Sequence, residues 1–139
     1  MKSTDELQKV LENTNDLEQY LNDNFEDINN ITFTEYLAKC LEEESLSKSD
    51  VIERSNIQKN YAYQIFDGSK NPSRNKVLAL ALSMKLDIPK TNRLLKLSNN
   101  SVLYPRIKRD SIIGFSINQS KSLMDVNILL DEMGEDIIE

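Results

Sequence analysis

Residues 74–86, RNKVLALALSMKL, are apolar on nearly every side when they are drawn as a helix. A helix of this kind is stable only if other elements cover its whole circumference, so it belongs at the centre of a small helical bundle. Elsewhere apolar residues recur at intervals of three and four, and the alternation typical of strands is scarce. These patterns predict an all-α fold, with a core of ordinary size for 139 residues.

Capping residues divide the remaining chain into helices. Thr32-x-x-Glu35 is a capping box, and Ser47-x-x-Asp50 resembles a second one. Serine caps and glycine stops mark further boundaries. Two short helices are predicted on either side of residues 13–16, and a third begins after Thr32. The next helices are predicted at 48–55, at 58–67 with a stop at Gly68, at 74–86 after the cap Ser73, and from Pro89 to about Leu97. The chain ends in a predicted hairpin of helices 107–117 and 123–133, the second of which lies between the cap Ser122 and the stop Gly134.

Composition argues against several classes of function. The chain has no histidine, one cysteine and three glycines, so it lacks the commonest general base, the commonest metal ligand and any glycine-rich phosphate loop. We therefore expect no enzyme activity, no metal and no cofactor. Cys40 falls on the apolar side of its helix, which predicts a core thiol. No apolar run approaches the ~20 residues of a membrane helix, and the N-terminus is polar and acidic, so we expect a cytoplasmic protein.

Charge is unevenly distributed along the chain, whose formal net charge is −6. Residues 1–45 hold 3 basic and 12 acidic side chains, a net of −9. Residues 46–110 hold 13 basic and 5 acidic side chains, a net of +8, and residues 111–139 hold 1 and 6, a net of −5. The basic middle has the charge expected of a phosphate-binding surface, although solvated helix faces also carry Lys and Arg.

Residues 46–73 lie in this basic block and have the layout of a helix-turn-helix: a helix, a turn at Asn56 and a second helix rich in amide and basic side chains. The stretches TEYLAKCLEEESLSKSDVIERSNI and YAYQIFDGSKNPSR resemble the phage-repressor (Cro/Xre-type) helix-turn-helix family, and most closely the Xre-like transcriptional regulators of low-GC Gram-positive bacteria. The resemblance implies a five-helix, lambda-repressor-like DNA-binding domain over residues 32–99. An acidic helical extension would precede it at 1–31, and a C-terminal helical hairpin would follow at 100–139.

Four residues depart from the usual pattern of that family. Members of the family usually have a small residue at the place of Ile52 and a larger β-branched residue at the place of Ala62. In this chain the larger residue is at position 52 and the smaller one at position 62, an exchange that conserves the total side-chain volume if the two positions face each other. Asn56 replaces the turn glycine, and asparagine tolerates positive φ well. Lys48 stands where many members have a glutamine whose amide bonds a phosphate, and so supplies a charge instead.

The resemblance makes residues 58–67 the recognition helix, whose polar side would enter the major groove. Gln and Asn can pair with adenine and Lys with guanine, so we predict base contacts from Lys59, Asn60, Tyr63 and Gln64. Outside this motif, polar residues on an exposed helix would simply be solvated. The residues predicted to contact phosphates are Ser47, Lys48, Gln58, Tyr61, Ser69, Lys70, Asn71 and Arg74.

Two functions remain open at this point. The first is a sequence-specific DNA-binding transcriptional regulator that acts as a homodimer on double-stranded DNA. The second is a protein-interaction adaptor or antitoxin-like module that no longer reads DNA, with acidic ends that bind a protein partner or mask the basic face. The C-terminal hairpin would either form the dimer interface or pack back on the domain, since it has more apolar residues than a thin hairpin can bury: Ile112, Ile113, Phe115, Leu123, Val126, Ile128, Leu129 and Leu130.

Overall fold

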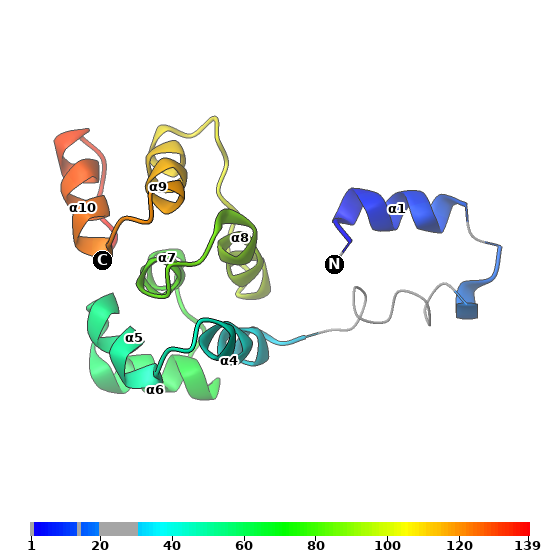
Figure 1. Ribbon diagram of the computed structural model, residues 1–139, viewed down its shortest axis with the longest axis horizontal. Coiled ribbons are helices and arrows are strands. Elements are labelled where there is room, and N and C mark those ends of the chain that lie inside the picture. Colours follow the sequence, from blue (N-terminus) through cyan, green and yellow to red (C-terminus); the bar gives the residue numbers. More distant parts are fainter. Residues whose placement is uncertain (1, 14, 20–30) are drawn as a thin grey trace. The chain divides into compact units, whose positions relative to one another are not determined.

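The computed structural model describes residues 2–13, 15–19 and 31–139. The chain divides into two compact units, Met1–Ile31 and Thr32–Glu139. All regular secondary structure in the described residues is helical, which confirms the predicted all-α class (Figure 1).

In the first unit, α1 spans Thr4–Glu12 and begins at Ser3, whose hydroxyl accepts a hydrogen bond from the Glu6 amide at 3.1 Å. The helix is amphipathic, but none of its residues is buried. The first of the two predicted N-terminal segments is therefore helical. The second, from Leu17 to Phe25, lies largely outside the described residues.

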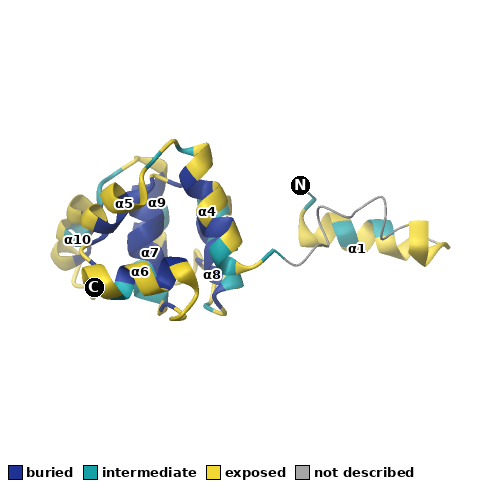
Figure 2. Cartoon of the chain, turned by 90° about the horizontal axis from the view of Figure 1, so that it is seen from below, coloured by how far each residue is buried: buried dark blue, intermediate teal, exposed yellow. Residues whose placement is uncertain are grey.

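The second unit consists of helices arranged around α7, which occupies the centre (Figure 1). Every residue of α7 from Val77 to Ser83 is buried, as its all-round apolar sequence predicted (Figure 2). Cys40 is also buried, at 1% exposure, which confirms the core thiol. The helices of this unit are α4 (Phe33–Glu43), α5 (Lys48–Ser55), α6 (Lys59–Asp67), α7 (Arg74–Ser83), α8 (Ile88–Leu97), α9 (Lys108–Asn118) and α10 (Leu123–Glu132).

Most predicted caps are present. The hydroxyls of Thr32, Ser47 and Ser122 each accept a hydrogen bond from the amide three residues on, at 3.1–3.2 Å. Ser73 is the exception: it occupies the predicted N-cap position of α7 with an extended backbone, but its side chain makes no capping hydrogen bond. Gly68 has φ +89° at the end of α6 and provides the predicted stop.

Some predicted boundaries differ from the observed ones. Gln58 is the N-cap of α6 rather than its first residue, and its side-chain oxygen accepts from the Tyr61 amide at 2.7 Å. The predicted helix 74–86 ends at Ser83, because Lys85 turns the chain with φ 57°. Pro89 is the second residue of α8, after Ile88, and Asp87 caps the helix.

The C-terminal hairpin packs against the rest of its unit, with α9 contacting α8 and α10 contacting α7. Six of its apolar residues are buried in this way: Ile112, Ile113, Ile117, Leu123, Val126 and Leu130. Phe115 and Ile128 remain 54% and 51% exposed. The hairpin therefore belongs to the core of this unit while keeping apolar side chains on its surface.

A buried ion pair fastens the start of the hairpin to the start of α7. Both terminal nitrogens of Arg74 donate to the Asp110 carboxylate, at 3.0 and 2.9 Å, and the Asp110 side chain is 2% exposed. Arg74 also donates to the carbonyls of Ser101 and Val102 at 2.9 and 3.2 Å. The Tyr104 amide donates to the same carboxylate at 2.9 Å. The Arg74 guanidinium thus joins the start of α7 to α9 and to the segment that precedes α9.

Candidate nucleic-acid interface

Helices α5 and α6 are joined at Asn56, which has φ 57° and ψ 15°. This left-handed conformation is the reason a glycine or an asparagine suits the turn, and it redirects the chain immediately after α5. The apolar residues predicted to hold the two helices together are all buried, at 6% exposure or less: Val51, Ile52, Ile57, Ala62 and Ile65. Burial of both Ile52 and Ala62 agrees with a volume-conserving exchange at those positions.

The opposite side of α6 carries the residues predicted to read bases. Lys59, Asn60, Tyr63 and Gln64 are all exposed, whereas Ala62, Ile65 and Phe66 face the core. Positions four apart on a helix lie on one face, so the four residues form two parallel rows, Lys59 with Tyr63 and Asn60 with Gln64. This gives α6 a continuous polar surface about two turns long.

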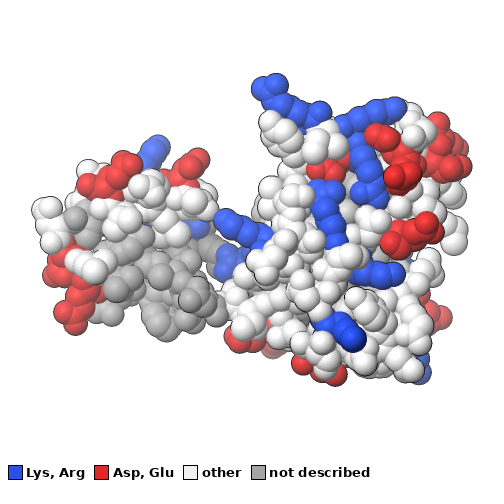
Figure 3. Space-filling model, turned by 180° about the vertical axis from the view of Figure 1, so that it is seen from behind, with Lys and Arg blue, Asp and Glu red and all other residues white. Residues whose placement is uncertain are grey.

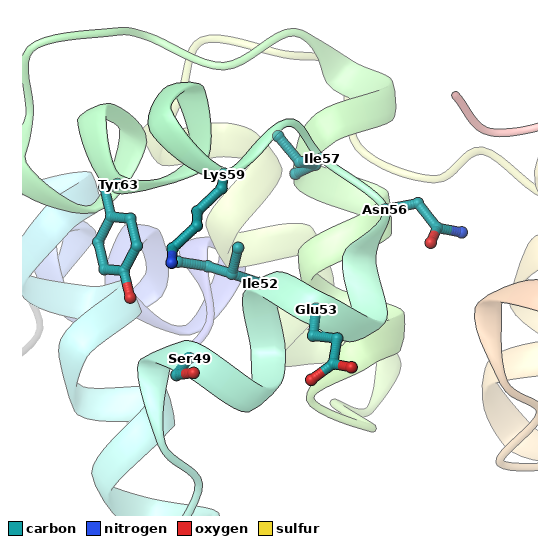
Figure 4. Close-up of a pocket in the computed structure, with 7 residues that line it drawn as sticks. All are labelled: Ser49, Ile52, Glu53, Asn56, Ile57, Lys59 and Tyr63. Carbon is teal, nitrogen blue, oxygen red and sulfur yellow. The ribbon is translucent and has the colours of Figure 1, made fainter.

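The first of these rows overhangs a hollow between α5 and α6. Figure 4 shows Lys59 and Tyr63 pointing from α6 toward α5, above Ile52. The hollow has a volume of about 390 Å³, and Ser49, Glu53, Asn56 and Ile57 complete its lining. Ser49 and Glu53 were not among the predicted site residues, because an exposed serine and glutamate on α5 carry no distinguishing signal in the sequence.

Five of the predicted phosphate-contacting residues keep a donor that faces solvent or is otherwise uncommitted. Ser47 uses its oxygen as an acceptor for α5, which leaves its hydroxyl hydrogen free. Gln58 likewise uses its oxygen and keeps its amide nitrogen. The Lys48 ammonium lies 5.3 Å from the centre of the Phe66 ring, and Lys48 and Lys70 are both exposed. Tyr61 is half-buried.

The other three residues are committed within the protein. Arg74 is held by Asp110 and two backbone carbonyls, so its donors are not available to a phosphate. Ser69 donates its hydroxyl to Asp67, and Asn71 donates one amide hydrogen to the Ser98 carbonyl at 3.2 Å. We therefore remove Arg74 and Ser69 from the phosphate-contacting set and keep Asn71 only through its second amide hydrogen.

Lys and Arg side chains gather along one face of the Thr32–Glu139 unit, with Asp and Glu concentrated to one side of them (Figure 3). Asp50 and Glu53 on α5 and Asp67 at the end of α6 bring negative charge into the motif itself. Hydrogen bonds from the Ser69 side chain and amide lower the pKa of Asp67, so this carboxylate stays ionised at neutral pH. The motif is therefore mixed in charge rather than uniformly basic.

The described residues contain no group of three or more His, Cys, Asp or Glu that could hold a metal ion. No helix within the described part of the chain is both long and apolar enough to cross a membrane.

Comparison of the chain with protein-family models, curated proteins and solved structures finds no match.

Proposed function

We propose that the protein is a sequence-specific DNA-binding transcriptional regulator, and that residues 32–99 form a five-helix, lambda-repressor-like domain. One observation carries the proposal. The only residues of α6 that face solvent at its start and middle are polar groups suited to base edges, and a left-handed turn at Asn56 fixes this helix against α5.

In the proposed complex α6 enters the major groove. Asn60 and Gln64 can each form two hydrogen bonds with adenine, and Lys59 can donate to guanine, each pairing being worth roughly 1–3 kcal/mol of discrimination. Tyr63 extends the row occupied by Lys59. Phosphate contacts come from residues around the helix starts and the loop after α6: Ser47, Lys48, Gln58, Tyr61, Lys70 and the remaining amide hydrogen of Asn71. Such contacts position the helix without specifying sequence.

A single recognition helix reads few base pairs, so we propose a homodimer with its two α6 helices separated by about 34 Å. Phe115, Met124 and Ile128 on the hairpin are exposed by 54, 70 and 51% and are candidates for the contact between copies. In this proposal the protein acts in the cytoplasm, and its function needs no catalytic group, metal or cofactor. Sedimentation equilibrium across a concentration series measures the oligomeric state directly.

Selection of bound duplexes from a random DNA pool tests binding, half-site and spacing together. We expect an enriched motif that occurs twice with two-fold symmetry, at a spacing near one helical turn. If the purified protein binds neither the pool nor any duplex at ~50 mM salt, where phosphate contacts are strongest, the proposal fails and the adaptor or antitoxin-like function is favoured.

Two substitutions separate base reading from phosphate contact. Gln64→Ala should weaken binding to the selected duplex by ~1–3 kcal/mol and relax the preference at one base pair. Lys48→Gln should weaken binding to selected and random duplexes alike and reduce the slope of log affinity against log salt by about 0.9. Glutamine is preferable to alanine at position 48, because it retains the side-chain stem beside Phe66. Equal weakening of all sequences by Gln64→Ala would contradict its assignment to base reading.

A further inference from the structure

Most of the positive charge in the basic block lies outside the helix-turn-helix. Residues 47–70 hold 4 basic and 3 acidic side chains, a net of +1. Residues 71–110 hold 9 basic and 2 acidic side chains, a net of +7. A phosphate-contacting surface that ended with the loop after α6 would leave most of this charge unused.

The segment from Asn99 to Ile107, here called the strap, follows α8 and lies directly beside the loop after α6. Asn71 donates to the Ser98 carbonyl, and Asn100 donates to the Pro72 carbonyl, both at 3.2 Å. The first bond joins the loop to the C-cap of α8, immediately before the strap, and the second joins the strap itself to the loop. The strap therefore borders the loop to which the proposed function assigns phosphate contacts.

Past this junction the strap is a rigid turn. The Ile107 amide donates to the Tyr104 carbonyl at 2.9 Å, which closes a four-residue turn with Pro105 in its second position, where proline is favoured. The Ser111 hydroxyl donates to the Pro105 carbonyl, and the Tyr104 amide is bound to Asp110. The backbone of the turn is thus held from both sides.

Two side chains of this turn are exposed to solvent. Tyr104 is 51% exposed, and Arg106 is exposed and forms no hydrogen bond or ion pair with any residue that the structure describes. The neighbouring cations are committed: Lys108 donates to the Met133 carbonyl, and Arg109 to Asn75 and the Asp136 carbonyl. The nearest acid in sequence, Asp110, is buried and neutralised by Arg74.

We propose that the strap is a second phosphate-contacting element, which uses the Arg106 guanidinium and the Tyr104 hydroxyl to bind the DNA backbone outside the base pairs read by α6. This inference rests on the proposed function. Arg106 is the sixth residue after Asn100, which is bonded to the loop, and six residues of extended chain span at most ~20 Å. Since each base pair rises 3.4 Å, the contact falls within about six base pairs of the phosphate nearest Asn71.

The test uses the full-length chain and the selected duplex with and without six flanking base pairs at each end. Arg106→Ala should lower affinity roughly three- to tenfold, equally on selected and random duplexes, and reduce the salt slope by about 0.9. Tyr104→Phe should have a smaller effect of the same kind. Removing the flanks should weaken the wild-type protein by a similar factor and leave Arg106→Ala nearly unaffected.

Arg54→Ala is the matched control. Arg54 is exposed and lies beside Leu82 and Ser83, at the far end of α7 from the strap, a helix of ten residues and thus ~15 Å long. The DNA affinity of the Arg54→Ala variant and its slope of log affinity against log salt should match those of the wild type. If Arg106→Ala behaves like this control while the wild type binds, the strap inference is wrong and the proposed function stands. If the wild type binds no duplex, both are wrong. A loss confined to one sequence would assign Arg106 to base reading instead and overturn the inference.

Discussion

Asp110→Ala should destabilise the Thr32–Glu139 unit more than any surface substitution. Asp110 accepts three hydrogen bonds, two from Arg74 and one from the Tyr104 amide, all at 2.9–3.0 Å, and its side chain is 2% exposed. The substitution leaves the Arg74 charge without its counter-ion and the Tyr104 amide without its acceptor. The Arg74 side chain is 23% exposed, and the hydrogen bond from the Tyr104 amide is partly buried.

The expected cost follows from the burial of the two partners. Removing one member of a buried ion pair typically costs 3–5 kcal/mol, because the remaining charge is uncompensated. The Arg74 side chain is 23% exposed and keeps two carbonyl acceptors, so we expect the lower end, about 3 kcal/mol. At an m-value of ~1–3 kcal/mol/M, the urea midpoint should fall by roughly 1 to 3 M.

Urea unfolding followed by circular dichroism measures this change, and two further variants interpret it. Lys39→Ala removes an exposed pair with Glu43, 3.9 Å apart, and should cost no more than ~0.5 kcal/mol. A double variant, Arg74→Met with Asp110→Leu, removes both charges and should recover at least half of the loss. A cost of Asp110→Ala below ~1 kcal/mol would refute the reasoning, since Arg74 would then be well solvated without its partner.

Three further predictions concern stability. Gly68→Ala should lower the free energy of unfolding by ~1 kcal/mol, because Gly68 has a positive φ of +89°. Gly134→Ala should cost a similar amount in the same urea assay, because Gly134 has φ +76° and open space around it. A much larger loss at Gly68 would indicate a steric clash, which the 3.5 Å gap to the nearest side chain does not predict. Thr91→Val should raise stability by roughly 1 kcal/mol, because the Thr91 hydroxyl is buried without a hydrogen-bond partner among the described residues; an unchanged or lower urea midpoint would contradict this. Burial raises the pKa of Tyr36 from 10.0 to about 12, so the folded state holds the phenol proton more tightly than the unfolded state does. The contribution of this group to stability is therefore fully present below pH 10 and should be lost as the pH rises from 10 to 12. Tyr36→Phe should flatten this fall in urea midpoints between pH 9 and 12, and an equally steep fall would exclude Tyr36 as its source.

The helices were predictable because their signals are local. A cap needs one side chain and the amide three residues on, as at Ser47 and Asp50, and the all-round apolar sequence of α7 predicts burial without reference to any partner. The turn at Asn56 was predictable for the same reason. Ser73 shows the limit of this logic, since a serine in the N-cap position need not form the bond.

The use of Arg74 was not predictable, because its partner is 36 residues away. An arginine after a DNA-contacting loop has the same local sequence whether it faces a phosphate or a carboxylate from another helix. The same holds for the strap, whose position beside the loop depends on hydrogen bonds between residues 27 and 28 apart. Periodicity and capping cannot report contacts of this range.

The net charge of −6 is a poor guide to DNA binding for this chain. At ~0.1 M salt, charges more than about 10 Å apart are largely screened, so the field at α6 depends on its immediate neighbours. Those neighbours are nearly balanced: the motif holds four basic residues, Lys48, Arg54, Lys59 and Lys70, and three acidic ones, Asp50, Glu53 and Asp67. Strong attraction to a duplex therefore requires cations beyond the motif, and Arg106 on the strap is exposed and uncommitted. The charge balance of the motif thus makes the flank dependence of binding the most discriminating measurement on this protein.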